Sequence, residues 1–543
     1  MKKDTTTPTA APPHGGLPPR GLGGTPSSPI ATGRFGRMFR HVPVYAHSEP
    51  SLVALGQAMV QDLEDGQLDE PLGEDDDDEN TAELDEELRL PAGYTYFGQF
   101  VDHDITFDPV SSLGRQNDPD ALVDFRTPRF DLDSLYGRGP SDQPYLYDPD
   151  GVHLTLGRRL SDDEQTGGPD LQRVATERAL IGDPRNDENL IVSQLQSAFI
   201  RFHNKVLDHV GGESPGLSKD DVFKLAQQTV RWHYQWVVVN DFLKRLVGEA
   251  VIKDIVDPSP YLVPEDVGLT IPQPRFRFYR WNEAPYMPVE FSVAAYRFGH
   301  SMVRPSYLIN EVAATDPPVE GASRIPLFSQ TGGPKQHLNG FRGLPDVWGV
   351  DWKFLLANIG DGSAEHLPQP SYKIDAQLSH PLGALPSSTV EPEVLVAGFD
   401  PAIAQSLAVR NLLRGLRLGL PSGQDVARAM GVEPPLTDEE LYGGLDLDSD
   451  ARADLAGHAP LWFYVLKEAE VRAQSAHLGP VGGRIVAEVL IGLLAGDPLS
   501  YLSVRPGWRP TLPSANEGRF TLSDIINFAI TPTGATAPPH YQG

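Results

Sequence analysis

Two aspartates flank a histidine inside an otherwise apolar and aromatic segment, YFGQFVDHDITFDP (residues 96–109). Charged groups among apolar side chains are costly unless a partner compensates them. If the segment is helical, Gln99 and His103 are four positions apart and therefore project from one face. Asp102 and Asp104 then flank that face, which is typical of a polar pocket. Acidic residues beside an ordinary helix N-terminus give the same pattern, so the segment alone leaves both interpretations open.

A second segment, RTPRFDLDSLYG (residues 126–137), has polar side chains at alternate positions. In an extended loop, alternation turns these side chains to one side. Carboxylate, hydroxyl and carbonyl oxygens are the ligands that Ca²⁺ prefers, although the spacing is not that of an EF-hand. Turn formation explains the same residues, and the interpretation as a calcium site gains support if Asp104 completes the shell. The alternating positions are Thr127, Arg129, Asp131 and Asp133.

Two further segments contain candidate charged groups. In GDPRNDENL (residues 182–190), Arg185 and Glu188 are three positions apart, so a short helix places both on one face. In YRFGHSMVRP (residues 296–305), His300 lies on a mainly apolar helix pattern. Taken singly, the first pattern is also typical of an exposed turn with a salt bridge, and the second of a packed core histidine.

Together and in this order, these segments resemble the animal-type haem peroxidases, the peroxidase–cyclooxygenase superfamily that also has bacterial members. The family's distal motif Gly-Gln-x-x-Asp-His-Asp is matched by residues 98–104. Its calcium loop, Thr-x-x-x-Asp-x-Ser/Asp followed by Tyr-Gly, is matched by residues 127–137. Its distal Arg-x-x-Glu is matched by residues 185–188, its proximal Arg-x-Gly-His by residues 297–300, and its proximal asparagine by Asn411.

The resemblance implies a haem site in which each polar residue has a role. His300 would be the axial iron ligand, and the side-chain oxygen of Asn411 would accept a hydrogen bond from its other ring nitrogen. His103 would act on hydrogen peroxide as general base and then general acid, as a neutral imidazole near its ordinary pKa. Arg185 would stabilise the negative charge that develops as the O–O bond breaks, and Gln99 would hold a distal water or halide.

The cofactors that the resemblance implies are haem b and Ca²⁺. Asp102 and Glu188 match the two carboxylates that form ester bonds to haem methyl groups in this family. Arg297 and Arg414 are expected to pair with the haem propionates, because arginine binds carboxylates in a bidentate manner. The expected calcium ligands are Asp104, Thr127, Asp131, Asp133 and the backbone carbonyl of Arg129.

Two departures from the family pattern concern the reaction. Asn189 stands where some members have a methionine that forms a third, sulfonium link to haem, and its presence disfavours chloride as a donor. Arg297 stands where cyclooxygenases and fatty-acid dioxygenases have a radical tyrosine, three residues before the proximal histidine. Tyr296 is offset by one residue, which is roughly 100° around an α-helix.

The resemblance therefore predicts a haem peroxidase that reduces hydrogen peroxide through a ferryl haem and oxidises a small donor. The expected donors are bromide, iodide, thiocyanate and phenolic compounds. The alternative within the superfamily is a haem-dependent fatty-acid dioxygenase. Two alternatives without haem remain open from the sequence: a non-haem metal site built from histidine and carboxylates, and an adhesion or scaffold protein that has kept the fold.

Helices are expected to position these residues, and the fold class is predicted as mainly α-helical with long ordered loops and little β structure. Ser218 predicts a helix start and Gly248 a helix stop, and His233 between them is predicted to be a packed core histidine. One haem peroxidase domain is expected over residues 33–543. The expected helices cover residues 51–63, 97–106, 192–210, 218–248, 289–303, 400–418, 422–430, 460–473 and 483–495.

Composition limits the other classes of function. The formal net charge is −29, and fifteen acidic residues lie between Asp62 and Glu87. Residues 62–88 are predicted to be a mobile acidic loop, with a docking patch for a basic partner or a cation as the alternative. Such acidity disfavours nucleic-acid binding, which needs Lys/Arg patches. The chain has no cysteine, which excludes disulfides and thiolate ligands.

The N-terminal sequence predicts a disordered Pro/Gly-rich tail over residues 1–32. This tail has no apolar stretch of the kind found in secretory signals, and no segment of the chain is apolar enough to cross a membrane. A cytoplasmic location or a non-classical export route is the resulting expectation. The sequence makes no prediction of the oligomeric state.

Overall fold

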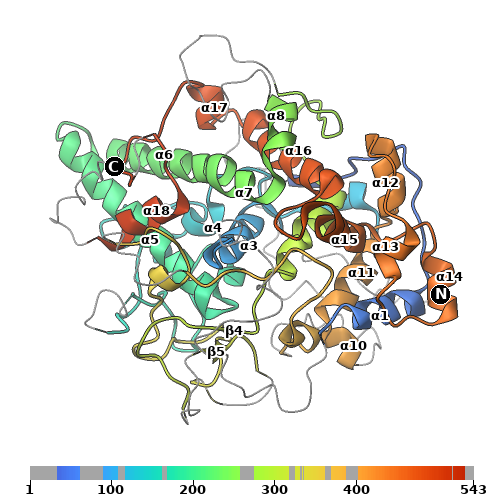
Figure 1. Cartoon of the computed structure of the whole chain (residues 1–543). Helices are drawn as coiled ribbons and strands as arrows, with labels where there is room; N and C mark the ends of the chain where they lie inside the picture. The colour runs from blue at the N-terminus through green and yellow to red at the C-terminus, as the bar shows by residue number, and fades with distance from the viewer. Residues whose placement is uncertain are drawn as a thin grey trace, which may run out of the picture.

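The computed structural model describes residues 33–61, 90–107, 117–161, 168–256, 274–316, 324–329, 333, 335–360, 368–386, 401–515 and 518–531 (Figure 1). The predicted tail and the predicted acidic loop lie outside these ranges. Within the ranges, no helix combines the length and apolar character needed to span a membrane.

Helices dominate the described chain, as predicted. In the first half the α-helices are α1 (Glu49–Ala58), α3 (Gly93–Ile105), α4 (Asp133–Tyr136), α5 (Leu190–Glu213), α6 (Lys219–Val237), α7 (Leu243–Val247) and α8 (Glu249–Val256). In the second half they are α10 (Pro401–Gln405), α11 (Leu407–Arg417), α12 (Gly423–Met430), α13 (Asp438–Tyr442), α14 (Ser449–Leu455), α15 (Leu461–Ala473), α16 (Pro480–Gly496), α17 (Tyr501–Val504) and α18 (Leu522–Ile530).

Short 3₁₀ and π segments connect or continue these helices. The 3₁₀ helices are η2 (Pro119–Ala121), η3 (Pro144–Leu146), η4 (Pro184–Asp187), η7 (Ala295–His300), η8 (Trp352–Phe354) and η9 (His380–Gly383). The π-helices are η5 (Val238–Phe242) and η6 (Glu290–Ala294).

Strands are short, which confirms the prediction of little β structure. β1 (Gly33–Gly36) pairs antiparallel with β2 (Val123–Asp124) and parallel with β3 (Met287–Pro288). A second pair, β4 (Ser306–Tyr307) and β5 (Ile325–Pro326), is antiparallel.

The helix with the distal motif, α3, lies in the middle of the fold (Figure 1). It packs on α5, which in turn packs on α6 and α18. Phe100 of α3 stacks on Phe199 of α5, with ring centroids 4.6 Å apart, and the Tyr234 ring of α6 meets both edge-on. Aromatic pairs of this kind stabilise a fold by more than the apolar area they bury. The contact therefore fixes one side of α3, and the opposite side of the helix faces the site.

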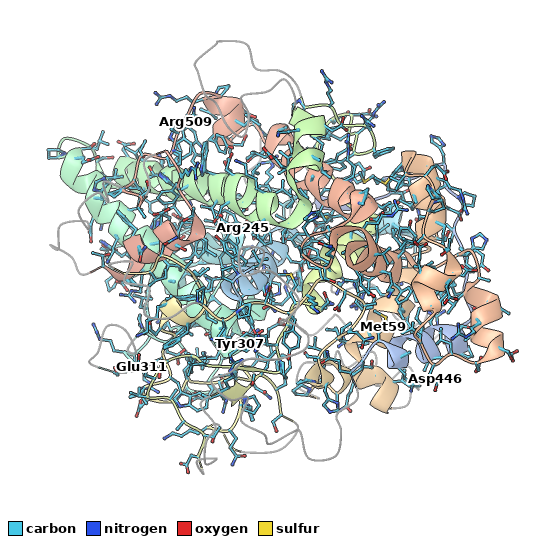
Figure 2. The ribbon with its side chains drawn as sticks, in the orientation of Figure 1. Met59, Arg245, Tyr307, Glu311, Asp446 and Arg509 are labelled. Atoms are coloured by element: carbon cyan, nitrogen blue, oxygen red, sulfur yellow. The ribbon has the colours of Figure 1, made fainter. Side chains whose placement is uncertain are left out.

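Side chains fill the space between the helices (Figure 2). Met59 and Tyr307, both labelled there, are fully buried, whereas Glu311 and Asp446 are exposed at the periphery. The predicted core histidine is also confirmed. His233 has no exposed surface; its Nδ1 lies 2.7 Å from the Thr229 carbonyl, and its Nε2 accepts from the Thr511 and Leu512 amides.

The predicted helix over 218–248 has the expected ends but a different middle. The Ser218 hydroxyl accepts from the Asp221 amide, and Gly248 follows the last turn with φ +71°, so the cap and the stop are confirmed. Between them the chain changes from α-helix to the π-helix η5 and back to α-helix. The predicted helix over 400–418 is similarly divided, because Ser406 ends α10 and caps α11.

The segment before the proximal histidine is not the single α-helix expected over 289–303. It consists of the π-helix η6 followed by the 3₁₀ helix η7, and Ala294 at the junction has φ −125° and ψ −79°. In a 3₁₀ helix, residues three apart lie directly above each other. The change of helix type therefore turns Arg297 and His300 to the same side. It also places Tyr296 about 120° from Arg297, rather than the 100° expected for an α-helix.

Candidate functional site

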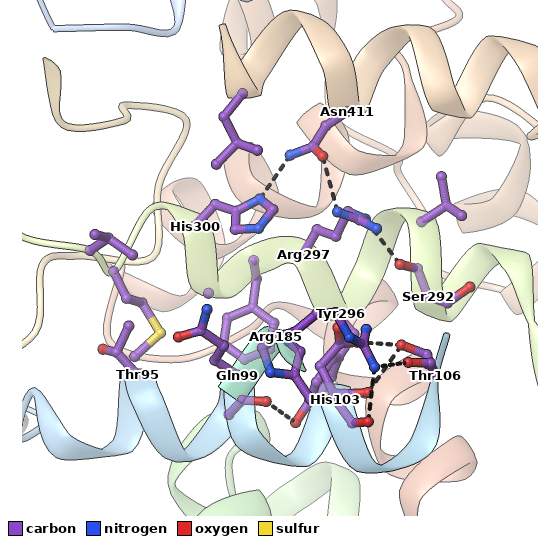
Figure 3. Close-up of a pocket in the computed structure, with 18 of the residues that line it drawn as sticks. Thr95, Gln99, His103, Thr106, Arg185, Ser292, Tyr296, Arg297, His300 and Asn411 are labelled. Carbon is purple, nitrogen blue, oxygen red and sulfur yellow. Dashed lines mark hydrogen bonds between the residues drawn. The ribbon is translucent and has the colours of Figure 1, made fainter. Parts of the chain in front are cut away.

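One cavity of about 350 Å³ brings the predicted haem-site residues together from four separate elements (Figure 3). Its volume is in the range of small-molecule and cofactor pockets. The elements are α3, η4 with the residues that follow it, η7 and α11. The predicted residues that line it are Gln99, Asp102, His103, Arg185, Glu188, Arg297, His300, Asn411 and Arg414.

The distal histidine is held in one tautomer by amide side chains behind it. His103 Nδ1 lies 2.7 Å from Asn186 Oδ1, and Asn186 Nδ2 donates to Gln196 Oε1 at 2.8 Å. Because the Asn186 oxygen can only accept, Nδ1 must bear the hydrogen. This leaves Nε2 of His103 as the basic nitrogen, on a side chain that lines the cavity.

The charge state of His103 differs from the sequence expectation. Burial, reinforced by the nearby Arg185 cation, lowers the pKa of His103 to about 3. Both effects disfavour the imidazolium. The expectation of a neutral imidazole is thus met at neutral pH, but the expectation of an ordinary pKa is wrong.

Arg185 is fixed beside the histidine by an acidic residue that the sequence analysis did not single out. Asp183 accepts from Arg185 Nη2 at 2.8 Å, and the same nitrogen donates to the backbone carbonyls of His103 and Thr106. Burial raises the pKa of Asp183, but Arg185 and Arg126 outweigh burial and hold that pKa below its usual range. The Arg185 guanidinium is therefore fixed at the distal wall, bonded to the His103 backbone.

Gln99 is engaged by protein partners. Its Nε2 donates to Glu188 Oε1, and its Oε1 accepts from Asn189 Nδ2 at 3.3 Å. The oxygen of Asn189 accepts from the Val192 amide and so caps α5. The position that is methionine in some relatives thus orients the Gln99 amide here, and burial raises the pKa of Glu188 to about 7.

The second carboxyl expected to bond to haem also lies at the cavity wall. Asp102 Oδ1 accepts from the Thr106 hydroxyl at 3.1 Å. Burial raises the pKa of Asp102, although Arg297 and Arg185 oppose the rise.

On the opposite wall, His300 and Asn411 are paired as predicted, but through a different atom. Asn411 Nδ2 lies 2.8 Å from His300 Nδ1, and Asn411 Oδ1 accepts from Arg297 Nη1 at 3.3 Å (Figure 3). The prediction that the oxygen faces the imidazole is therefore wrong for this structure, because the Arg297 cation takes the oxygen. A half-turn of the amide exchanges the two atoms. Burial, with Arg297 and Arg410 adding to it, lowers the pKa of His300 to about 3.

Behind α3, three carboxylates meet where the calcium site is predicted. One oxygen from each of Asp104, Asp131 and Asp133 lies within 4.8 Å of the others. The Thr127 hydroxyl donates to Asp131 Oδ2 at 2.6 Å, so this predicted ligand also lies at the cluster. Burial and the neighbouring carboxylates raise the pKa of Asp104. Arg126 is 3.2 Å from Asp133, and a bound Ca²⁺ would offset the remaining negative charge.

The loop reaches this arrangement by a kink rather than by the extended alternation that was predicted. Leu132 adopts a left-handed conformation with φ +57°, and Asp133 then begins α4. The side chain of Arg129 lies 3.9 Å from Asp497, on α16's C-terminal side. Its carbonyl as a calcium ligand stays a prediction.

Proteins of similar sequence are animal peroxidases. The family model described as animal haem peroxidase matches residues 113–344. Chorion peroxidase of Drosophila melanogaster is 26% identical over 251 residues, 46% of this chain and 26% of the relative. Eosinophil peroxidase of Mus musculus is 28% identical over 256 residues, 47% of this chain and 30% of the relative. Over residues 113–344, less than half of its length, the chain is similar to the animal haem peroxidase family.

Solved structures share the fold of this chain. Peroxidase A from Dictyostelium discoideum aligns over 94% of this chain and 95% of its own, with a TM-score of 0.54 and 14% identity. Fatty acid alpha-dioxygenase of Arabidopsis thaliana aligns over 90% and 75%, with a TM-score of 0.52 and 14% identity. At 14% identity, these similarities show only that the fold is shared. The chain spans less than a third of the length of chorion peroxidase and of eosinophil peroxidase.

The cavity fits the haem that the resemblance to animal haem peroxidases implies. His300 offers an imidazole as an iron ligand, and the arginines that line the cavity suit the carboxylates of haem. One of these arginines, Arg410, was missed in the sequence. It lies one helical turn before Arg414 on α11, and that i, i+4 spacing could have identified it.

The other missed residues, Asn186, Asp183 and Arg126, act from behind the cavity wall or beside it. Two of them flank Arg185 in GDPRNDENL. Asp183 is two residues from Arg185, so that ion pair is local, whereas Arg126 and His103, the other partners of Asp183 and Asn186, lie in distant segments. The short sequence therefore gives no signal that Asn186 orients His103.

Removal of calcium should destabilise the distal side. We expect chelation, or the Asp104→Asn substitution, to lower the thermal midpoint of the holoenzyme, because the clustered carboxylates lose their counter-ion. At a calcium concentration 100 times the Kd, binding contributes about 2.7 kcal/mol to stability. Calorimetry with and without Ca²⁺ measures the shift. Asp150→Asn, in an exposed turn, serves as the control. If the thermal midpoints of wild type and Asp104→Asn respond equally to Ca²⁺, Asp104 is not a calcium ligand.

Proposed function

We propose that this chain is a haem peroxidase that reduces hydrogen peroxide and oxidises a small donor. The observation that supports the proposal most directly is the pairing of two neutral histidines on opposite walls of one cavity. His103 presents a basic nitrogen there, Arg185 stands beside it, and His300 is held by Asn411.

The reaction divides between the cofactor and the protein. Haem, when bound through His300, would supply iron that exchanges electrons with the peroxide. Overall, hydrogen peroxide gains two electrons and two protons and yields two waters, and the donor supplies the electrons. The protein has to move one proton between the two peroxide oxygens and stabilise the charge that develops on the leaving one.

His103 suits the proton transfer because its Nε2 is unprotonated at neutral pH and is free of the hydrogen bond that occupies Nδ1. It would accept the proton from one peroxide oxygen and return it to the other, as general base and then general acid. Arg185 would stabilise the negative charge, since its position is fixed by Asp183 before the reaction begins. Asn186 would keep the imidazole in the required tautomer throughout.

The donors that we propose are bromide, iodide, thiocyanate and phenolic compounds. Asn189 is the reason for leaving chloride out, because it is bonded to Gln99 and to the α5 backbone and has no sulfur for a third link. A steady-state assay of haem-saturated protein with this donor panel tests the proposal. We expect iodide and phenols to be oxidised at the expense of peroxide. Absence of peroxide-dependent oxidation with every donor would overturn it.

A fatty-acid dioxygenase is the second candidate, because the fold is shared with one such enzyme. Tyr296 lines the cavity, and its hydroxyl donates to the Gly98 carbonyl at 3.3 Å. Oxygen uptake with an unsaturated fatty acid, without added donor, separates the two functions. The peroxidase proposal predicts no sustained uptake.

We also propose that Asp102 and Glu188 form ester bonds with haem after exposure to peroxide. Both carboxyls border the cavity, and their pKa values are raised by burial. Acidified-solvent extraction of peroxide-treated protein should leave most of the haem on the polypeptide. The Asp102→Ala, Glu188→Ala double variant should release it, and release from the wild type would contradict the proposal.

A further inference from the structure

An indole side chain touches the proximal wall of the cavity from the outside. Trp462, in the first turn of α15, has its ring centroid 6.4 Å from that of His300, in an edge-on arrangement. Its Nε1 donates to the Arg297 carbonyl at 3.1 Å, and the side chain is buried. The indole is therefore held in one position beside the expected axial ligand, although it does not itself line the main cavity.

A small hollow leads from this indole toward the surface. It is lined by Trp462 and Asn411 on the inner side and by Tyr45 and His47 on the outer side. The Tyr45 ring stacks on the His458 ring, with centroids 4.2 Å apart and planes inclined by 9°. His47 meets Tyr45 edge-on at 4.6 Å. The hollow thus separates Trp462, which contacts His300, from the ring cluster of Tyr45, His47 and His458, and Trp462, Tyr45 and His47 all line it.

The outer end of the hollow, at Tyr45, has the features of a binding site for an aromatic molecule. Tyr45 is half-buried, the neighbouring Val44 is 52% exposed, and prolines line the hollow beside them. The Tyr45 hydroxyl donates to the Asp454 carbonyl at 3.1 Å, which fixes the ring. Asp425 lies 3.3 Å from His458, so the acidic groups here favour a neutral or cationic ligand over an anion.

The main cavity is too small to admit large donor molecules as readily as small ones. Its volume of about 350 Å³ also has to accommodate haem. Phenol and indole side chains are the protein groups that most readily lose a single electron. A tyrosine at the surface and a tryptophan beside the axial histidine are therefore suited to collect electrons from molecules that do not enter the cavity.

We propose that Tyr45 and Trp462 form a second oxidation site, at which bulky phenols and aromatic amines are oxidised at the protein surface. The inference rests on the proposed peroxidase function, which supplies the oxidant. After peroxide is reduced, one electron passes from the Trp462 indole to the haem cavity, and Tyr45 replaces it while its phenolic proton goes to water. A donor phenol then loses one electron and one proton and restores Tyr45. Two donors balance one peroxide, and two phenoxyl radicals and two waters are the products.

The test uses the holoenzyme and three variants. Tyr45→Phe keeps the ring packing but removes the phenol, and Tyr45→Trp restores an oxidisable ring. Tyr145→Phe is the matched control, because Tyr145 is 49% exposed on η3, an element that contributes no residue to either hollow. Each protein is mixed with one equivalent of hydrogen peroxide without donor and frozen for electron paramagnetic resonance. Each is then assayed with iodide and with a phenol coupled to a soluble polymer.

We expect a tyrosyl radical signal in the wild type and in Tyr145→Phe that is lost in Tyr45→Phe. The rate with the polymer-linked phenol should fall about tenfold in Tyr45→Phe and recover in Tyr45→Trp, while the iodide rate stays unchanged in all of them. An unchanged radical signal and polymer-linked phenol rate in Tyr45→Phe, with iodide still oxidised, would overturn this inference alone. Failure of every protein to oxidise iodide would overturn the peroxidase proposal and this inference with it.

Discussion

The His300→Ala variant should purify without bound haem and therefore without a Soret band. His300 is the histidine on the wall opposite His103, and burial together with two arginines keeps its imidazole neutral, as metal ligation requires. Removal of the ring leaves the pocket arginines and carboxyls in place but takes away the nitrogen that would bind iron. Haem content per polypeptide, measured by absorbance after reconstitution, checks this result.

Two further measurements separate ligation from folding. His209→Ala removes a histidine that is partly exposed on α5 and pairs with Glu213, and it should retain full haem content. Imidazole added to His300→Ala can enter the space left by the side chain and should restore part of the Soret band. Wild-type haem content in His300→Ala would show that another residue is the ligand.

The separate positions of neighbouring side chains in the distal helix could be predicted from the sequence. The i, i+4 spacing of Gln99 and His103 brings both to the cavity, and Asp104 points to the opposite side, where it meets Asp131. The shared face of Gln99 and His103 follows from helix periodicity, which depends on local sequence. The direction of Asp104 was expected from the family resemblance. The helix is also anchored by its aromatic face, whose residues were visible as an apolar pattern.

What the sequence could not predict depends on contacts between distant segments. Asn186 orients His103 across 83 positions of sequence, and the orientation of the Asn411 amide is decided by Arg297, 114 positions away. The change from the π-helix η6 to the 3₁₀ helix η7 was also not predicted; it aligns Arg297 directly with His300, which in an α-helix would lie about 60° apart. The pKa of His103 depends on the degree of burial, which residue types do not specify.

The His103→Ala variant should bind haem normally but react with hydrogen peroxide about 10²–10⁴ times more slowly, the range typical of a lost general acid–base residue. The cofactor would be held from the other wall by His300, so the Soret band of the resting protein should remain. Stopped-flow absorbance after mixing with peroxide measures the rate. A rate within a factor of a few of the wild type would show that His103 does not transfer the proton.

The pH dependence of the same rate tests the environment of His103. Its pKa is lowered to about 3, so the basic form is fully present above that pH and is lost as the pH falls through it. The wild-type rate should therefore be flat from about pH 8 to about pH 5, whereas an imidazole of ordinary pKa would lose half its activity near pH 6.5. Asn186→Asp places a carboxylate 2.7 Å from Nδ1 in place of the amide oxygen, stabilises the imidazolium and should move the acid limb upward. If both proteins have the same acid limb, Asn186 does not control the protonation of His103.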